Sequence, residues 1–566
     1  MSESRNHSWY LLLAALGITV LMCISICAVF TGHRLASQQP NEPDSEGLPS
    51  AADAVADATS APEAPVKEAV RWSVVLPPDY NPEQSYPVVF EYATSEPQLV
   101  NLQPGQAILA SFAAQTDTPL KASLSEADAL AQLAALQKEY HLDEDRIYLV
   151  TADLAGLAFA SRHASRFSAA VLQFTQNPAA DAWKDLPLDN LNNLEFCIDT
   201  SRLPLPDASL RKLYDELELH LRPMIAMYEY PIAHPSSPLP EMLSLLSMTL
   251  PLHHDRIHWQ TDSISNGEAW WLRAEGLENY GKPATFWARY EPDDINSVAL
   301  QIRIKTTNLN ALALKRTWKD FKEVRTFILT IDDQRIFLPT RSIDPEWCVI
   351  RQKDGNWQAD SAEPTELCKS ASCEGPIAHL FQGPFLIIPG TADTDTAAMW
   401  QQSAQDLAQR WKEATGQTAT ILPDSACTSQ TLAGHHLVLL GSPRENLLVN
   451  NLLDEHPEFL REIYLRNHSD DDATETPETA RLCCLSLYPA APYSSGKLAL
   501  IVLADHPSDI GFAWQPLFTT MATQGDYLLF QPNETANGET EKEWDNVHDF
   551  RVRAVGWFSS TWEMAD

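Results

Sequence analysis

The chain has 566 residues, too many for a single core, and its 44% hydrophobic and 9% aromatic residues are ample for three or four packed domains. Its formal net charge of -36 argues against a nucleic-acid partner, because phosphate backbones are bound by clustered Lys and Arg. No basic stripe with interleaved aromatic residues occurs along the sequence, which supports the same exclusion.

The first expected element is a membrane anchor. Tyr10–Phe30 carries no charged residue and is long enough to cross a bilayer as a helix, and it exceeds the usual apolar stretch of a cleaved signal. Residues 1–36 are therefore expected to form an N-terminal transmembrane helix, with cleavage near Arg34–Ala36 as the alternative. We therefore expect a single-pass protein of the cell membrane whose bulk is extracytoplasmic, in the periplasm or at the cell surface.

An acidic tether is expected to follow the anchor. Residues 37–70 are rich in Ala, Pro, Asp, Glu and Ser and contain no aromatic residue, so they cannot bury enough surface to order themselves. We expect this stretch to be a disordered linker between the membrane and the globular part.

The first α/β domain is predicted for residues 71–252. Strand-like apolar runs alternate with an amphipathic helix at Ala127–Tyr140, and Ser125 with Asp128 has the spacing of a capping box. This alternation predicts a mostly parallel sheet covered on both faces. The predicted strands are Trp72–Leu76, Pro87–Tyr92, Arg146–Val150 and Ala170–Phe174.

The pattern changes twice further along the chain. Residues 253–380 contain short alternating segments between turn residues and no long amphipathic helix, which predicts an antiparallel β-sandwich. Residues 381–566 return to buried strands, such as Pro384–Ile388, and a helix at Thr396–Ala414, which predicts a second α/β domain of flavodoxin-like type.

Cysteine spacing suggests one crosslink. Cys368 and Cys373 are close enough in sequence to close a small loop as a disulfide in an oxidising compartment. No paired Cys-x-x-Cys occurs, so a zinc framework is not expected, and we predict neither a metal nor a cofactor.

Three phrases of the first domain resemble the catalytic domain of prolyl-oligopeptidase-like (S9-type) hydrolases and related esterases. Leu76–Pro82 is similar to that family's entry into its sheet, Glu139–Leu149 to the approach to its nucleophile elbow, and Ala164–Val171 to the strand that returns afterwards. The resemblance covers residues 71–250. It implies an α/β-hydrolase fold, and the order of the later domains resembles exported multidomain bacterial members.

The chain departs from this family where the chemistry should be. The resemblance implies Gly-x-Ser-x-Gly at the elbow, whereas Thr151–Ala155 places Asp153 at the serine position and leaves both glycines out. Where the family carries a His-Gly-Gly oxyanion loop, this chain has Tyr92–Ser95, so two converging N–H groups are not expected.

The acid and the base are also altered. The acid position falls on Ser201, with Asp199 two residues early, and His234 is the candidate base although one residue of the family's spacing is missing. With three of four catalytic elements damaged, we expect a pseudoenzyme that binds or scaffolds an unknown peptide, glycan or protein ligand.

Active hydrolysis of peptide or ester substrates is the alternative. Some α/β-hydrolases use an aspartate nucleophile at this elbow, a plan that Asp153 with His234 would suit. A displaced serine, Ser161 or Ser165, is a further candidate nucleophile. The plainer interpretation is that Asp153 caps the following helix, since Asp is a good N-cap residue.

Three other segments contain functional residue types. His253–His258 has metal-ligand types but is interpreted as a solvated junction, and Gly390–Thr396 is interpreted as an acidic helix cap rather than an anion site. Trp270, Trp271 and Trp287 could form a sugar-stacking platform, although aromatic residues at alternate strand positions more often belong to the core.

Overall fold

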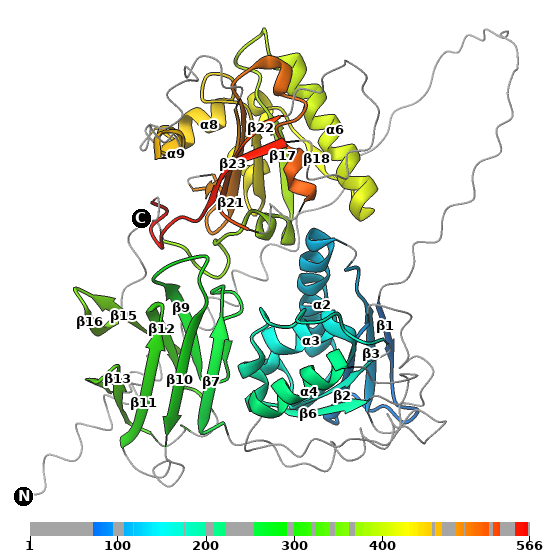
Figure 1. Ribbon diagram of the computed structural model, residues 1–566, viewed down its shortest axis with the longest axis vertical. Helices are drawn as coiled ribbons and strands as arrows, with labels where there is room; N and C mark the ends of the chain where they lie inside the picture. Colours follow the sequence, from blue (N-terminus) through cyan, green and yellow to red (C-terminus); the bar gives the residue numbers. More distant parts are fainter. Residues whose placement is uncertain are drawn as a thin grey trace, which may run out of the picture. The chain divides into compact units, whose positions relative to one another are not determined.

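The described residues of the chain form four β-sheets and the helices that pack on them (Figure 1). The chain divides into a unit of Met1–Glu68 and a unit of Ala69–Asp566, and all described residues belong to the second. The predicted anchor and the predicted tether lie outside the described residues, and no described helix is long and apolar enough to cross a membrane. The computed structural model describes residues 72–93, 107–116, 118–174, 176–199, 208–220, 254–290, 299–318, 321, 324–339, 346–360, 368–454, 459–466, 482–491, 493–519, 524–532 and 550–563.

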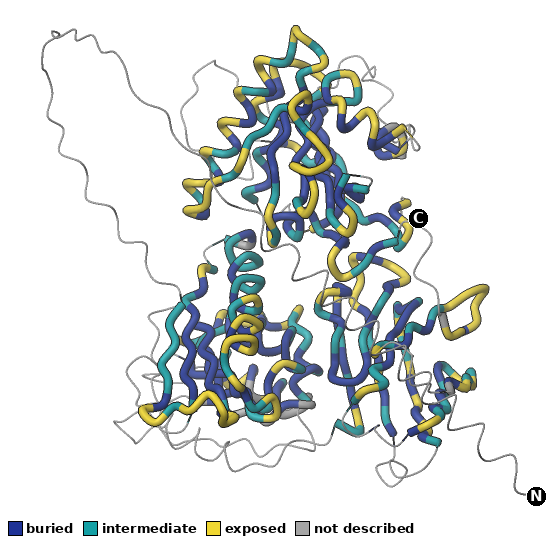
Figure 2. Tube along the Cα trace, turned by 180° about the vertical axis from the view of Figure 1, so that it is seen from behind, coloured by how far each residue is buried: buried dark blue, intermediate teal, exposed yellow. Residues whose placement is uncertain are grey.

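The first sheet has six strands in the order β1-β3-β2-β4-β5-β6. β1 is antiparallel to β3, and every other neighbouring pair is parallel, so the predicted mostly parallel sheet is confirmed. β2 and the second half of β4, from Ile147 to Thr151, are almost entirely buried, as central strands covered on both faces require (Figure 2). The strands are β1 (Trp72–Val75), β2 (Tyr86–Ala93), β3 (Ile108–Ala113), β4 (Leu142–Ala152), β5 (Ala169–Gln173) and β6 (Glu195–Asp199).

Helices α2 (Pro119–Glu139), α3 (Asp153–Arg162) and α4 (Ala208–His220) all supply side chains to one core cluster with this sheet. The predicted start of the first of them was wrong. α2 begins at Pro119, and its N-cap is Thr118, whose side chain accepts from the Lys121 N–H at 3.3 Å. Ser125 lies inside the helix and bonds the backbone of Gln115 instead, so the Ser125–Asp128 spacing is not a capping box. Two 3-10 turns, η2 (Ala164–Arg166) and η3 (Leu188–Asn193), connect the later strands.

The middle of the chain forms two five-stranded sheets, ordered β14-β13-β11-β10-β7 and β16-β15-β12-β9-β8. Alternate residues of these strands are buried, which is the signature of sheets with one face on a core. The β11–β13 pair is parallel, an exception to the antiparallel pattern that was predicted. The strands are β7 (Arg256–Thr261), β8 (Glu268–Ala269), β9 (Leu272–Leu277), β10 (Ala284–Tyr290), β11 (Ala299–Thr307), β12 (Leu309–Lys315), β13 (Thr326–Ile331), β14 (Gln334–Pro339), β15 (Trp347–Lys353) and β16 (Asn356–Asp360).

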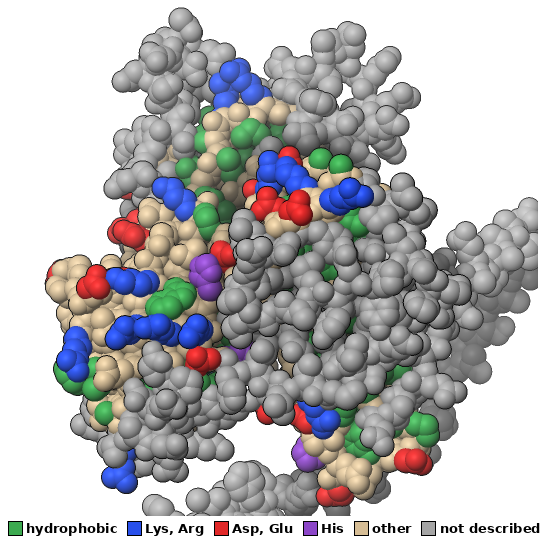
Figure 3. Space-filling view, turned by 60° about the horizontal axis from the view of Figure 1, so that its bottom comes forward, with side chains coloured by type: hydrophobic (Ala, Val, Ile, Leu, Met, Phe, Trp, Pro, Cys, Tyr) green, Lys and Arg blue, Asp and Glu red, His purple; other side chains and the backbone are tan. Residues whose placement is uncertain are grey.

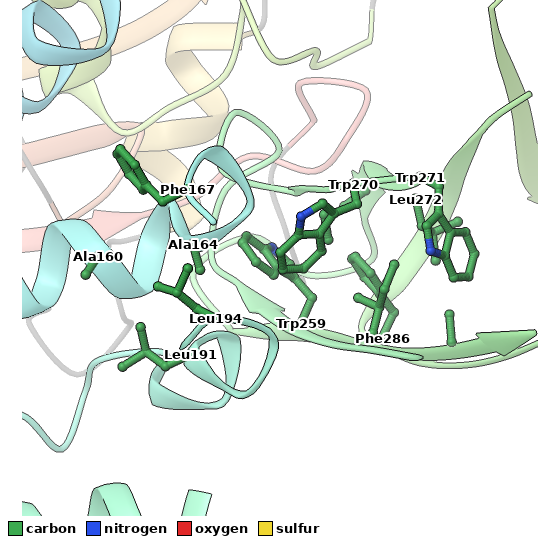
Figure 4. Packing of buried hydrophobic residues seen from close by; sticks show 14 of the residues in the cluster. Ala160, Ala164, Phe167, Leu191, Leu194, Trp259, Trp270, Trp271, Leu272 and Phe286 are labelled. Carbon is green, nitrogen blue, oxygen red and sulfur yellow. The ribbon is translucent and has the colours of Figure 1, made fainter. Parts of the chain in front are cut away.

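Tryptophans fill much of the core between these elements (Figure 4). Trp270 is 8% exposed and Trp271 fully buried, and the Trp271 indole donates to the His254 carbonyl at 2.6 Å. The core interpretation of this pair is therefore confirmed. Trp287 differs, since it is 36% exposed on the outer side of β10.

The last sheet has seven strands in the order β18-β17-β19-β21-β20-β22-β23. Its first four strands are parallel and wound as in flavodoxin-like folds, but the other three pair antiparallel. The flavodoxin-like prediction thus describes only half of the sheet. The elements are β17 (Phe385–Pro389), β18 (Thr420–Ile421), β19 (His436–Leu440), β20 (Cys483–Pro489), β21 (Leu498–Ala504), β22 (Tyr527–Pro532), β23 (Phe550–Gly556), α6 (Ala397–Thr415), α7 (Ser429–Leu432), α8 (Leu447–Leu452), α9 (Phe459–Arg466), η6 (Ile377–Gln382), η7 (Asp424–Ala426), η9 (Pro507–Asp509) and η10 (Gln515–Phe518).

The predicted disulfide between Cys368 and Cys373 is not formed. The Cys373 thiol is unbridged and points to the Lys497 carbonyl oxygen, with the sulfur 3.5 Å away. The short segment between the two cysteines closes through backbone hydrogen bonds between Ser370 and Cys373 instead. Burial raises the pKa of Cys373 to about 12, which keeps it a protonated, unreactive thiol.

A buried ion pair ties the last sheet to the sandwich. Lys369 and Asp526 are both fully buried, with Nζ and Oδ2 2.5 Å apart. The Lys369 ammonium also donates to the Phe558 carbonyl at 3.0 Å and lies 3.8 Å from the centre of the Tyr280 ring. Because Tyr280 precedes β10, this cation–π contact links the two parts of the chain.

Glu374 makes a second buried link to the sandwich. Its carboxylate accepts from the Ser263 hydroxyl at 2.5 Å and from the Ile264 and Ser265 N–H groups at 2.9 and 2.7 Å. Burial raises the pKa of Glu374 to about 7, against the opposing effect of these hydrogen bonds. The folded protein therefore keeps a proton there that the unfolded chain releases near its usual pKa of 4.5.

This proton predicts a pH dependence of stability. The contribution of Glu374 to the free energy of unfolding should fall as the pH rises from about 4.5 to 7, because the folded state binds more protons over that range. Relative to Glu374→Gln, the parent should lose about 1–2 kcal/mol between pH 5 and pH 7.5, measured by urea unfolding. Parallel pH profiles for the parent and Glu374→Gln would contradict this prediction.

Candidate functional site

The candidate site is the turn that joins the central strand β4 to helix α3. Asp153 is the first residue of α3 and has a φ of 56°, a left-handed backbone that non-glycine residues adopt rarely. A sharp, strained strand-to-helix turn at this place is the geometry of the nucleophile elbow of α/β-hydrolases. The turn between β4 and α3 has this kind of backbone, with an aspartate at its strained position.

The Asp153 side chain turns back onto its own helix. Its Oδ1 accepts from the N–H of Ala155 at 3.0 Å and from the N–H of Gly156 at 3.4 Å. Bonds to the second and third residues ahead are the pattern by which aspartate satisfies the open N–H groups of a first helical turn. These bonds resemble those of a capping aspartate, although Asp153 is the first residue of α3 and Ala152, which has no side-chain cap bond, is its N-cap.

The close packing of the elbow is achieved in an unusual way. The Thr151 hydroxyl donates to the Tyr92 carbonyl at 2.8 Å and fills the space over the first turn of α3. A Cβ atom on Gly156 would lie 1.8 Å from Thr151 Oγ1, so only glycine fits there. Gly156 lies one residue beyond Ala155, which holds the position of the second motif glycine. A comparison limited to the motif positions therefore does not detect it.

A partly buried polar cluster lies at the C-terminal end of α3. Glu126 Oε1 is 2.6 Å from Arg162 Nη1, and its Oε2 lies 3.4 Å from His163 Nε2. Although burial opposes ionisation, the nearby Arg162 and His163 hold the pKa of Glu126 below its usual value. Burial and Glu126 both raise the pKa of Tyr92.

This cluster lacks a nucleophile. Among the described residues no hydrogen bond joins His163 to a hydroxyl or a thiol. The histidine of the cluster is instead held against Glu126 and the ring of Phe159, whose centroid is 4.9 Å away. The arrangement therefore supports packing of α2 against α3 rather than proton transfer to a nucleophile.

The remaining triad candidates are located only in part. Asp199 ends β6, in register with Gln173 of β5, which itself pairs with Ala152 beside the elbow. The backbone thus brings Asp199 to the sheet edge that carries Asp153, although two strands away. Ser201 and His234 lie outside the described residues, so their predicted roles as acid position and base remain predictions.

The displaced serines are engaged elsewhere. Ser161 is fully buried and its hydroxyl donates to the Ala158 carbonyl at 3.0 Å, within the same helix. The Ser165 hydroxyl donates to the Glu268 carbonyl at 2.7 Å. Neither hydroxyl bonds a histidine among the described residues, and since His234 lies outside them, the displaced-serine alternative stays a prediction.

Two other candidate segments are explained by internal contacts. The ring of His254 stacks on Trp270 with centroids 4.1 Å apart, and no described group of three or more His, Cys, Asp or Glu is placed to hold a metal ion. In the loop after β17, the Gly390 and Ala392 N–H groups donate to backbone carbonyls. Both amides are therefore engaged within the protein. Asp393 accepts from the Asp395 N–H at 2.9 Å in the loop before α6, whereas the N-cap of α6 is Thr396 without a side-chain cap bond, so the predicted acidic helix cap is not formed.

Comparisons with known proteins give partial likenesses only. No protein-family model matches the chain, and no curated protein matches it. Similar solved structures include a thermostable esterase (16% identity, 31% of this chain and 56% of that chain, TM-score 0.23), a ferulic acid esterase from Anaeromyces mucronatus (13%, 28% and 76%, 0.23) and an isopeptidase (15%, 31% and 36%, 0.22). The chain spans about half the length of the thermostable esterase. At such identities and TM-scores no activity is carried over to this chain.

Proposed function

We propose that this chain is a pseudoenzyme of the α/β-hydrolase type, which binds or scaffolds a peptide, glycan or protein ligand. The observation that carries this proposal is the hydrogen bonding of Asp153. A nucleophile must point toward substrate, whereas the Asp153 carboxylate accepts two N–H groups of its own helix. The elbow serves as a structural turn between strand and helix.

The surroundings of the elbow support the same proposal. The side chain of Thr151 occupies the place of the family's first elbow glycine and is locked onto the Tyr92 carbonyl. Tyr92 is itself buried between aromatic rings, stacked on Phe159 with centroids 4.1 Å apart. The end of β2 is therefore packed into the core. In hydrolases of this type, the segment at this position supplies oxyanion donors.

The proposed location is the cell membrane. We expect the uncharged segment Tyr10–Phe30 to anchor the protein by a single span, with the globular part outside the cytoplasm. This expectation rests on the sequence alone.

Fluorophosphonate labelling tests the loss of a serine nucleophile. We expect no covalent label on the native chain, because activation of a serine requires a base within hydrogen-bond reach and Ser161 and Ser165 donate to backbone carbonyls. Intact-mass spectrometry after incubation with the probe provides the readout, with an active serine esterase as positive control. A stoichiometric adduct that forms on the native chain, but not on chain that was heat-unfolded before the probe was added, would contradict the proposal, and peptide mapping would then locate the nucleophile.

An aspartate nucleophile is the rival mechanism, favoured by one observation. The φ of 56° at Asp153 preserves the strained turn on which α/β-hydrolases expose their nucleophile. This rival requires Asp153 to break its two cap hydrogen bonds and to meet a base such as His234. Its test is the closing experiment of the Discussion.

A further inference from the structure

A basic surface is assembled on the outer face of the five-stranded sheet β14-β13-β11-β10-β7. Alternate residues along a strand point to opposite faces, and the buried set of this sheet, such as Phe286 and Ile302, faces the core. The other set carries arginines on four of its five strands: Arg256 on β7, Arg289 on β10, Arg303 on β11 and Arg335 on β14.

The strand register places these four arginines in one line. Arg256 pairs with Arg289, and Arg289 pairs with Arg303. Arg303 is opposite Thr330, which is opposite Arg335. With neighbouring strands about 4.8 Å apart, this arginine row is roughly 19 Å long.

Aromatic side chains accompany the arginine row. Trp287, 36% exposed, occupies the neighbouring outward position of β10, and the guanidinium of Arg289 lies 5.5 Å from its ring centre. Phe337, 59% exposed, lies near Arg335 in the same way, at 5.0 Å. Figure 3 shows Lys and Arg side chains crossing one side of the molecule beside hydrophobic and histidine side chains.

A second line of polar residues runs beside the first. His258 and Lys305 are the register partners of Trp287 on either side. Acidic groups lie at the margins of the face: Lys305 Nζ is 2.9 Å from Asp333, and His258 Nδ1 is 3.8 Å from Asp189.

The described ion pairs of the arginine row lie at its Arg256 end. Arg256 Nε is 3.7 Å from Asp255 Oδ2, a loose pair at one end. Within the described part of the chain, no carboxylate is paired with Arg303 or Arg335, and both are exposed. A cationic line in a chain of net charge -36 requires an explanation other than the general composition.

We propose that the arginine row and Trp287 bind a linear polysaccharide that carries carboxylates, such as a polyuronate. Guanidinium groups match carboxylates in geometry, and a line of them fits a polymer with regularly repeated carboxylates. The exposed indole offers an apolar face to the C–H face of a sugar ring. This proposal goes beyond the proposed function and does not depend on the elbow.

The sequence could not reveal this surface. Consecutive arginines of the row are separated by 14 to 33 positions in the sequence, and they meet only through strand register. The absence of a basic stripe along the sequence therefore does not extend to the folded surface.

Affinity electrophoresis of the full-length chain tests the proposal, with polygalacturonate in the gel and its fully methyl-esterified form as the uncharged comparison. We expect retardation by polygalacturonate only. Arg303→Gln/Arg335→Gln should raise the dissociation constant about tenfold, and Trp287→Ala should raise it several-fold. Lys353→Gln/Lys412→Gln removes the same two charges from exposed positions elsewhere and should change nothing.

Three outcomes would overturn the proposal. One is an absence of retardation by polygalacturonate. Another is equal weakening by the arginine pair and by the lysine control pair. The third is equal retardation by polyglutamate or single-stranded DNA, which would indicate general polyanion binding. Because no hydrolysis is measured, none of these results bears on whether the elbow is catalytic.

Discussion

Replacing Asp526 by alanine is expected to lower the free energy of unfolding by about 3–5 kcal/mol, the cost of leaving a buried charge without its partner. The Lys369 ammonium would keep the Phe558 carbonyl and the Tyr280 ring but lose its carboxylate, 2.5 Å away. The Phe558 N–H, which donates to Asp526 at 2.8 Å, would lose its acceptor as well. Urea unfolding at pH 7 measures the effect.

Two comparison variants make this result specific. Asp395→Ala removes an exposed carboxylate of the same part of the chain and should stay within about 0.5 kcal/mol of the parent. Lys369→Met/Asp526→Leu removes both charges and should recover much of the loss, because an apolar pair of similar volume often replaces a buried ion pair without cost. An Asp526→Ala variant as stable as Asp395→Ala would show that the Lys369–Asp526 ion pair does not stabilise the fold.

The elbow gives the second large effect. Gly156→Ala should destabilise the fold by about 2–3 kcal/mol, since its Cβ would lie 1.8 Å from Thr151 Oγ1 and force that hydroxyl off the Tyr92 carbonyl. The higher helix propensity of alanine offsets only about 1 kcal/mol of this loss. Gly511→Ala is the matched control, because nothing lies within 4 Å of the Cβ position there.

A compensating change tests the mechanism behind this loss. Thr151→Gly/Gly156→Ala places the glycine where the S9-type motif has it and should be more stable than Gly156→Ala alone. In a double-mutant cycle we expect a coupling of about 1–2 kcal/mol between the two positions. Additive effects would mean that the two residues do not share one space at the elbow.

Much of the fold could be predicted from the sequence because its strands are apolar and its turns polar. The strand at Arg146–Val150 was recognised, and the structure extends it to Leu142–Ala152. The start of α2 could not be predicted because Ser125 resembles a cap by residue type alone. Ser125 lies inside the helix, and its hydroxyl bonds the backbone N–H and carbonyl of Gln115. Local sequence cannot distinguish a cap from a mid-helix serine with a tertiary partner.

Strand direction was also beyond the sequence pattern. A buried apolar run such as Leu498–Ala504 has the same appearance in a parallel and an antiparallel pair, so the change of direction between β21 and β20 was not foreseen. The same limit applied to surfaces, since register alone brings Arg289 and Arg303 together.

The candidate site could be placed but not fully constructed. The family-like phrases before and after the elbow located Asp153 at the end of β4, and the turn lies there. The role of Asp153 depended on where its carboxylate points, which the sequence left open between a nucleophile and a cap. The geometry of Ser201 and His234, outside the described residues, is still a prediction.

Hydrolysis by the full-length chain tests the central claim most directly. p-Nitrophenyl esters and prolyl-peptide substrates should be assayed in parallel with the native chain, Asp153→Ala and His234→Ala, with folding of each checked by urea unfolding. We expect turnover no higher than buffer in all three. Asp153→Ala should lose only about 1 kcal/mol of stability, because it removes the hydrogen bond from the Ala155 N–H to the Asp153 carboxylate. Turnover by the native chain that disappears in both folded variants would contradict the account and establish Asp153 as the nucleophile.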